Sequence, residues 1–189
     1  MALFSKCFMS TTSSMFIQSI FQAVVPFHLF SFTLGAIQLM TLPNAGGHSE
    51  RSEALSFEVL HRILGCELCK AEMEIKYLSP NWKKTDYLIQ LRSHKVAVSV
   101  TRAVGYPNPQ FFDESAAVEL LKKKLSGICI SSLGVVDEDK WERQILHIFT
   151  QTPQAATYLK FAYHSLPPIL RGNTIVICTV AGNHKWIFS

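Results

Sequence analysis

Two neighbouring segments carry the residues whose types and spacing could do chemistry. The first segment begins at Asp86, and the second contains Ser99 and Thr101 and ends at Arg102. Side chains alternate between the two faces of a strand, so a hairpin of these segments would bring Asp86 beside Ser99 and Thr101. A carboxylate at such a place can hold Mg²⁺, and a neighbouring cation can offset the charge of a phosphate. The spacing therefore indicates the chemistry of phosphodiester hydrolysis.

At these residues the chain resembles the PD-(D/E)XK, or restriction-endonuclease-like, nuclease superfamily. The signature of that superfamily is an Asp at the start of one core strand, followed by Glu/Gln-x-Lys on the next strand. The resemblance covers roughly residues 50–182, and Asp86 matches the Asp. Ser99 stands at the Glu position and Thr101 at the Lys position, with Arg102 one step beyond. The resemblance implies a Mg²⁺-dependent nuclease whose catalytic positions are Asp86, Ser99, Thr101 and Arg102.

The second half of the signature is replaced by Ser-Val-Thr-Arg. A hydroxyl cannot replace an anionic metal ligand, and an arginine stays protonated and activates water poorly. We therefore expect a nuclease-like domain that acts on or binds nucleic-acid phosphodiesters, with its activity lost or altered. The alternative is a non-catalytic interaction module, tethered to a membrane through residues 15–40. In that alternative Asp86 caps a turn and Arg102 forms a salt bridge at the end of a strand.

Two further acids are candidate metal ligands beside Asp86. Glu58 lies on a predicted helix, where the superfamily often places another acid, and the alternative is a solvated charge on the helix surface. Glu74 lies on a predicted strand and could supply a displaced carboxylate, or it could face water. Glu74 also begins a Glu-x-Lys triplet, but this triplet precedes Asp86 and does not follow the order of the signature.

Several lysines could approach a phosphate in place of the missing one. Lys83 and Lys84 precede Asp86 in a predicted turn, Lys95 opens the next strand, and residues 122–124 form a run of three lysines on a predicted helix. Lysines also keep turns and helix surfaces solvated, and this role explains their presence equally well. The net charge of +4 and the pI near 8.8 allow phosphate binding without requiring it.

The elements that must position these residues follow from periodicity and caps. The pattern predicts an α/β (α+β) fold with a central mixed sheet flanked by helices, in the order α-β-β-β-α-β-α-β. The chain has 189 residues and 48% apolar content, enough for one domain with a core. The order agrees with a restriction-endonuclease-like core followed by an extra helix and strand. The predicted elements are a helix over 53–65, strands over 70–77, 85–91 and 95–102, a helix from Asp113, a strand over 144–150, a helix from Thr152 to about 166, and a strand over 174–180.

Residues 1–48 differ in composition from the remainder, residues 49–189, which we expect to form the nuclease-like domain. Lys6 is the only charged residue before Glu50, and the apolar run over 15–40 is long enough to span a bilayer. A secretory signal or membrane anchor, a mitochondrial presequence and an unstructured extension are three interpretations of this segment. The first two would place the protein in the secretory pathway, a membrane or the mitochondrion.

Overall fold

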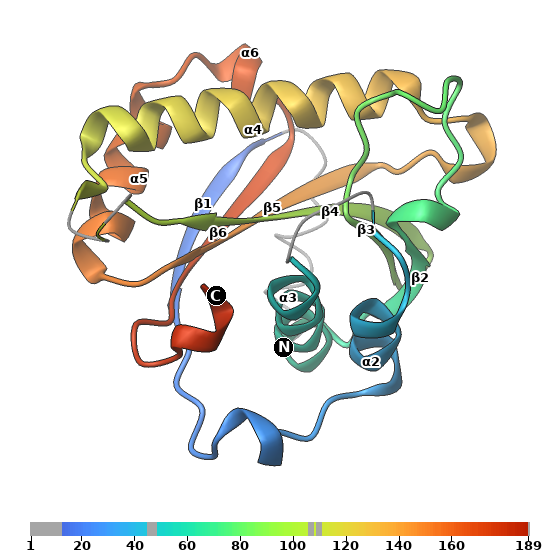
Figure 1. Ribbon diagram of the computed structural model, residues 1–189. Coiled ribbons are helices and arrows are strands. Elements are labelled where there is room, and N and C mark those ends of the chain that lie inside the picture. Colours follow the sequence, from blue (N-terminus) through green and yellow to red (C-terminus); the bar gives the residue numbers. More distant parts are fainter. Residues whose placement is uncertain (1–12, 45–48, 106–107, 109–110, 189) are drawn as a thin grey trace.

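A computed structural model describes residues 13–44, 49–105, 108 and 111–188. Its centre is a mixed six-stranded sheet with the strand order β1-β6-β5-β4-β3-β2 (Figure 1). β2, β3 and β4 pair antiparallel, whereas β4, β5, β6 and β1 pair parallel. The strands are β1 (Met15–Ile20), β2 (Glu67–Ala71), β3 (Tyr87–Leu91), β4 (His94–Ala103), β5 (Arg143–Thr150) and β6 (Thr174–Val180).

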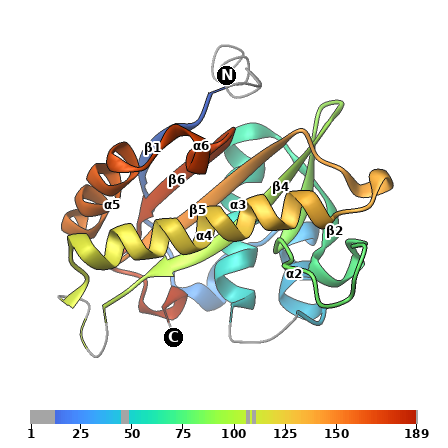
Figure 2. The same cartoon turned by 90° about the horizontal axis from the view of Figure 1, so that it is seen from above.

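Helices cover both faces of this sheet, so the fold has three layers (Figures 1 and 2). One face carries α2 (Leu34–Thr41) and α3 (Glu50–Leu64), and the other carries α4 (Glu114–Gly134) and α5 (Pro153–Ser165), with the short α6 (Pro168–Arg171) beside α4. Two apolar cores result, because alternate residues of each strand face opposite layers. Strands β5 and β6 are buried along their whole length, as expected for parallel strands covered on both faces. The predicted mixed α/β fold is therefore confirmed.

Local signals explain where the helices begin and end. Gly65 ends α3 with a φ of 67°, a left-handed conformation that a glycine adopts without strain. Asp113 accepts a hydrogen bond from the N–H of Ala116 and caps α4, which continues through Gly127 to Gly134. Thr152 caps α5 in the same way, with Pro153 in the first turn. Each of these caps was predicted from the sequence.

The first strand of the hairpin region is shorter and earlier than predicted. Alternation indicated a strand over 70–77, but β2 spans Glu67–Ala71 and a 3-10 turn, Glu72–Glu74, follows it. The Glu74 carboxylate accepts a hydrogen bond from the N–H of Ala71, at 2.8 Å. This bond stabilises the turn that follows β2.

The apolar residues near the N-terminus form part of the sheet and of a helical layer. β1 lies against β6, with Ile17 packed on one core and Phe16 on the other, and α2 packs against α3. Within the described ranges, no helix is long and apolar enough to cross a membrane. The predicted membrane or targeting segment over residues 15–40, and the localisation based on it, are therefore wrong. Side chains of β1 pack against both cores, whereas Val24 and Leu34, further along the run, are exposed.

The division of the chain into residues 1–48 and a domain over 49–189 stays a prediction. The contacts of β1 with β6 and of α2 with α3 cross it. Residues 1–12, including Lys6, lie outside the described part of the chain.

Candidate active site

Asp86 lies immediately before β3, at the point where β4 runs on without an antiparallel partner. β3 begins at Tyr87, opposite Val98, whereas β4 continues to Ala103. The Asp86 Oδ2 atom accepts a hydrogen bond from the N–H of Val100, at 2.5 Å, and so takes the place of the missing partner strand. Among the described residues, Oδ2 is the only oxygen of this carboxylate that accepts a hydrogen bond.

Glu53, in the first turns of α3, is an acid whose pKa depends on Asp86, although Glu72 is the acid that raises the pKa of Asp86 most. The Glu53 side chain is buried, with 5% exposure, and burial together with the charge of Asp86 raises its pKa to about 7. A hydrogen bond with Ser49 opposes this rise. Burial likewise raises the pKa of Asp86 to about 6, against the opposing effects of the Val100 N–H and of Lys124. The two carboxylates influence each other, so near neutral pH the pair favours an added proton or another cation.

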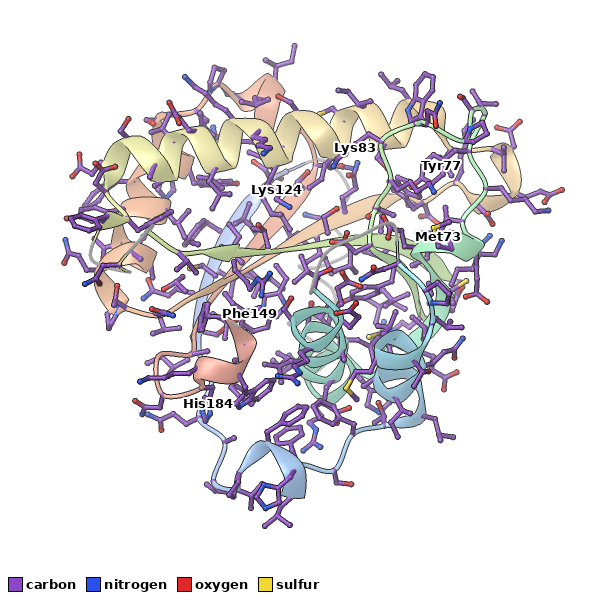
Figure 3. All side chains as sticks on the ribbon, in the orientation of Figure 1. Met73, Tyr77, Lys83, Lys124, Phe149 and His184 are labelled. Atoms are coloured by element: carbon purple, nitrogen blue, oxygen red, sulfur yellow. The ribbon has the colours of Figure 1, made fainter. Side chains whose placement is uncertain are left out.

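Two lysines approach these acids from the other layer and from the loop before β3. The Lys124 Nζ atom, on α4, lies 3.4 Å from the carbonyl oxygen of Val100, the residue that binds Asp86. Burial lowers the pKa of Lys124, and the charge of Asp86 opposes this effect. The stem of Lys83 packs on α4 at Gly127, beside Lys124 (Figure 3). Both helical layers therefore bring charged groups to one end of β3.

A hollow opens in front of Asp86. Its volume is about 310 Å³, and Glu72 adds a third negative charge to its wall. Two larger hollows, of about 580 and 480 Å³, lie against α2 and α3, but Asp86, Lys83 and Lys124 line neither of them. The smaller hollow is therefore the candidate site, because the wall of this hollow contains Asp86, whose pKa is raised, although Glu53 and Lys124 are not among the lining residues. The hollow is lined by Glu72, Pro80, Asn81, Trp82, Lys83, Lys84 and Asp86.

We call Glu53, Glu72, Asp86, Lys83 and Lys124 the acid–lysine cluster. Carboxylate oxygens are the donors that Mg²⁺ prefers, and one or two protein carboxylates with water molecules are its usual ligand set. In the described ranges, no group of three or more His, Cys, Asp or Glu side chains is close enough to hold a metal ion. The pair of Asp86 and Glu53 fits the chemistry of a two-carboxylate Mg²⁺ site, and the two lysines fit a phosphate next to it.

Of the predicted catalytic strand, the structure brings Ser99 close to Asp86 but places Arg102 elsewhere. The Ser99 hydroxyl lies 3.2 Å from that of Thr85, directly before Asp86. Thr101 lies two residues further along β4, on the same face as Ser99. Arg102 lies three residues beyond Ser99, about 10 Å along the strand, and its guanidinium donates a hydrogen bond to the carbonyl oxygen of Ile187. The positive charge that lowers the pKa of Asp86 most is that of Lys124.

The two other predicted metal ligands are engaged in local structure. The Glu58 carboxylate accepts hydrogen bonds from Thr33, at 2.8 and 2.9 Å, and pairs with Arg62 at 2.7 Å. These partners hold the start of α2 against α3 and lower the pKa of Glu58 despite its burial. Glu74 binds the N–H of Ala71.

The sequence contained a signal for Glu53 that the periodicity argument did not use. Glu53, Phe57 and Leu60 are spaced i, i+4, i+7 and therefore share one face of α3. An acid on a face that is otherwise apolar and buried is unusual, and it marks a candidate functional group. Glu58 lies about 140° around the helix from Glu53 and faces α2 instead. The sequence predicts both Lys83 and the run 122–124 as lysines that could approach a phosphate, but it does not distinguish Lys124 within that run.

Comparisons with known proteins give no family for this chain. No family model matches it. The chain is similar to the AAC-rich mRNA clone AAC4 protein of Dictyostelium discoideum, with 38% identity over a 165-residue alignment that covers 84% of this chain. Those residues span about a quarter of that relative, 24% of its length. Among solved structures, the chain is similar to SfsA of Pyrococcus furiosus in complex with Ca²⁺, with a TM-score of 0.31 and 16% identity, over 74% of this chain and 70% of that one.

Proposed function

We propose that this chain is a nuclease-like domain of the PD-(D/E)XK type, which binds nucleic-acid phosphodiesters at the acid–lysine cluster and hydrolyses them with Mg²⁺. One observation carries the proposal. Asp86, at the start of a core strand, accepts the Val100 N–H, the Lys124 Nζ atom lies 3.4 Å from the Val100 carbonyl oxygen, and the charge of Asp86 raises the pKa of the buried Glu53. In this proposal Lys124 takes the role of the lysine that is missing at position 101.

Each group of the cluster has a role in this proposal. Asp86 and Glu53 would hold Mg²⁺. A bound Mg²⁺ would polarise a phosphoryl oxygen and lower the pKa of a water molecule. Lys124 offsets charge on the phosphate next to the acid pair. Lys83 and Lys84 lie on the wall of the hollow and position the neighbouring backbone phosphates. Ser99 donates or accepts a hydrogen bond at the base of the site.

A nuclease assay with matched variants tests the proposal. Wild-type protein is incubated with single- and double-stranded DNA and RNA, with Mg²⁺ or with EDTA. Asp86→Asn keeps an acceptor for the Val100 N–H but removes the charge, so it should lower cleavage at least about 100-fold. Asp137→Asn, at an exposed aspartate of another turn, should have no effect. Cleavage that survives Asp86→Asn unchanged would remove this carboxylate from the mechanism.

A second candidate function is the non-catalytic interaction module, and the hydrogen bond from Val100 to Asp86 favours it. That bond shows Asp86 acting as a cap for β4, a role that needs no catalysis. Nucleic-acid binding separates the two candidates. If the protein is a module without a phosphate site, the wild type should bind nucleic acid no better than Lys124→Met does. Fluorescence anisotropy with Lys122→Met, an exposed lysine on the same helix, as control gives this comparison.

A further inference from the structure

A continuous chain of hydrogen bonds crosses the buried core from the edge strand β1 to the candidate site. The hydroxyl of Ser19 lies 2.8 Å from that of Thr179, which lies 2.8 Å from Nε2 of His147. Nδ1 of His147 lies 2.8 Å from the hydroxyl of Ser56, which lies 2.7 Å from that of Tyr87. Four of these five residues are at most 1% exposed. The chain links β1, β6, β5, α3 and β3.

The partners at the inner end fix the direction of this chain. The Tyr87 hydroxyl is buried, and in the described part of the protein its hydrogen-bond partner is Ser56. A buried O–H donor without an acceptor is costly, so Tyr87 donates to Ser56, and Ser56 in turn donates to Nδ1 of His147. The imidazole then carries its hydrogen on Nε2 and donates it to Thr179. Burial lowers the pKa of His147 to about 3, so the ring is neutral and keeps one donor and one acceptor.

The inner end of the chain joins the two elements that carry the acid pair. Ser56 lies three residues after Glu53, on the next turn of α3, and Tyr87 directly follows Asp86. The bond between Ser56 and Tyr87 therefore sets the distance between the first turns of α3 and the start of β3. We propose that Ser56, held by Tyr87 and His147, is the positioning residue that fixes Glu53 opposite Asp86. This inference rests on the proposed function, because it concerns the same acid pair.

A purely structural role is the natural competitor of this inference. Apolar side chains of similar size would fill the same volume at equal or better stability, since buried polar groups gain little net free energy from their hydrogen bonds. A hydrogen-bond network in which every donor and acceptor has a partner holds the connected groups in a single orientation. Two carboxylates that share a cation need such a fixed separation, because metal–oxygen distances vary by only a few tenths of an ångström.

Tyr87→Phe removes the donor at the inner end while the ring still packs, and Tyr163→Phe is its matched control. Tyr163 is also buried, on α5, and its hydroxyl has no hydrogen-bond partner among the described residues. We expect Tyr87→Phe to weaken Mn²⁺ binding about tenfold, measured by electron paramagnetic resonance, and Tyr163→Phe to leave it unchanged. We also expect the carboxyl ¹³C signals of Glu53 and Asp86 to shift in the first variant and not in the second.

The ring nitrogens of His147 report on the chain itself. Nitrogen NMR of the wild type should show the hydrogen on Nε2, unchanged between pH 5 and 8. A hydrogen on Nδ1 would overturn the assigned direction. Wild-type carboxyl signals and wild-type Mn²⁺ affinity in Tyr87→Phe would reduce the chain to a structural feature and overturn the inference.

The carboxyl signals keep this test separate from the proposed function. If the wild type binds no Mn²⁺ and cleaves nothing, the proposed metal chemistry fails. A shift of the Glu53 and Asp86 carbons in Tyr87→Phe alone would then still support the positioning role of Ser56.

Discussion

Neutralising Glu53 should stabilise the protein at alkaline pH, because folding buries this carboxylate beside Asp86. The pKa of Glu53 rises from its ordinary value of 4.5 to about 7 in the folded state. At about 1.4 kcal/mol for each unit of pKa, this rise corresponds to about 3 kcal/mol once both states are ionised. The folded state holds the proton more tightly than the unfolded chain does. Its contribution to stability is therefore complete below about pH 4.5 and is lost as the pH rises through about 7.

Urea unfolding of wild-type protein and Glu53→Gln at pH 5 and pH 8, in EDTA, measures this effect. The difference in the free energy of unfolding between the two proteins should change by about 2 to 3 kcal/mol in favour of the variant between pH 5 and pH 8. A saturating divalent cation should reduce the change, because it offsets the charge of the ionised pair. Equal pH dependence of the two proteins would refute the claim that Glu53 is buried against Asp86.

Glu58→Gln is the matched control on the same helix. The hydrogen bonds from Thr33 and the pairing with Arg62 lower the pKa of Glu58, so its ionised form stabilises the fold. That contribution is present above the ordinary pKa of about 4.5 and is lost as the pH falls through the lower value of the folded state. Glu58→Gln should therefore be less stable than the wild type at pH 8. A gain of stability at pH 8 in both variants would point to a general effect of helix charge.

Three further predictions follow from the same structure. Lys124→Met should weaken binding to nucleic acids of any sequence and should lower the salt dependence by about one phosphate contact, read from anisotropy titrations at several salt concentrations. Ile17→Ala should cost about 2 kcal/mol in urea unfolding, because Ile17 packs on the core, whereas Ile20→Ala, at a side chain with 71% exposure, should cost less than about 0.5 kcal/mol. Gly134→Ala should cost at least about 2 kcal/mol in the same assay, because the added Cβ would lie 1.9 Å from Nε1 of Trp82, and an unchanged free energy of unfolding would contradict the close approach.

Local signals were sufficient for most elements of the fold. Gly65, Asp113 and Thr152 mark helix ends through hydrogen bonds or backbone angles that involve a few adjacent residues, and such signals can be found in a sequence. β1 could not be found in this way. Its partner β6 lies about 160 residues further along the chain, so an apolar run that pairs within the sheet has the same composition as one that enters a membrane.

The candidate site was predictable only in part. Asp86 lies at the start of a core strand, as the resemblance implied, and its position depends on the short-range pairing of β3 with β4. The convergence of Glu53 and Lys124 depends on how α3 and α4 cross the sheet, which side-chain packing over many residues determines. Figure 2 shows α4 lying across the strands, a crossing that brings one lysine of the run 122–124 to the site. Arg102 follows the signature positions in the sequence, and in the structure its guanidinium donates a hydrogen bond to the carbonyl oxygen of Ile187.

The central claim is that Asp86 and Glu53 form one cation site next to Lys124. Isothermal titration calorimetry of Mn²⁺ into wild-type protein, Asp86→Asn and Asp137→Asn at pH 8 tests it most directly. The claim predicts one bound ion for wild type and Asp137→Asn, and at least about tenfold weaker binding for Asp86→Asn. Equal affinity in all three proteins, or no binding to the wild type, would contradict it.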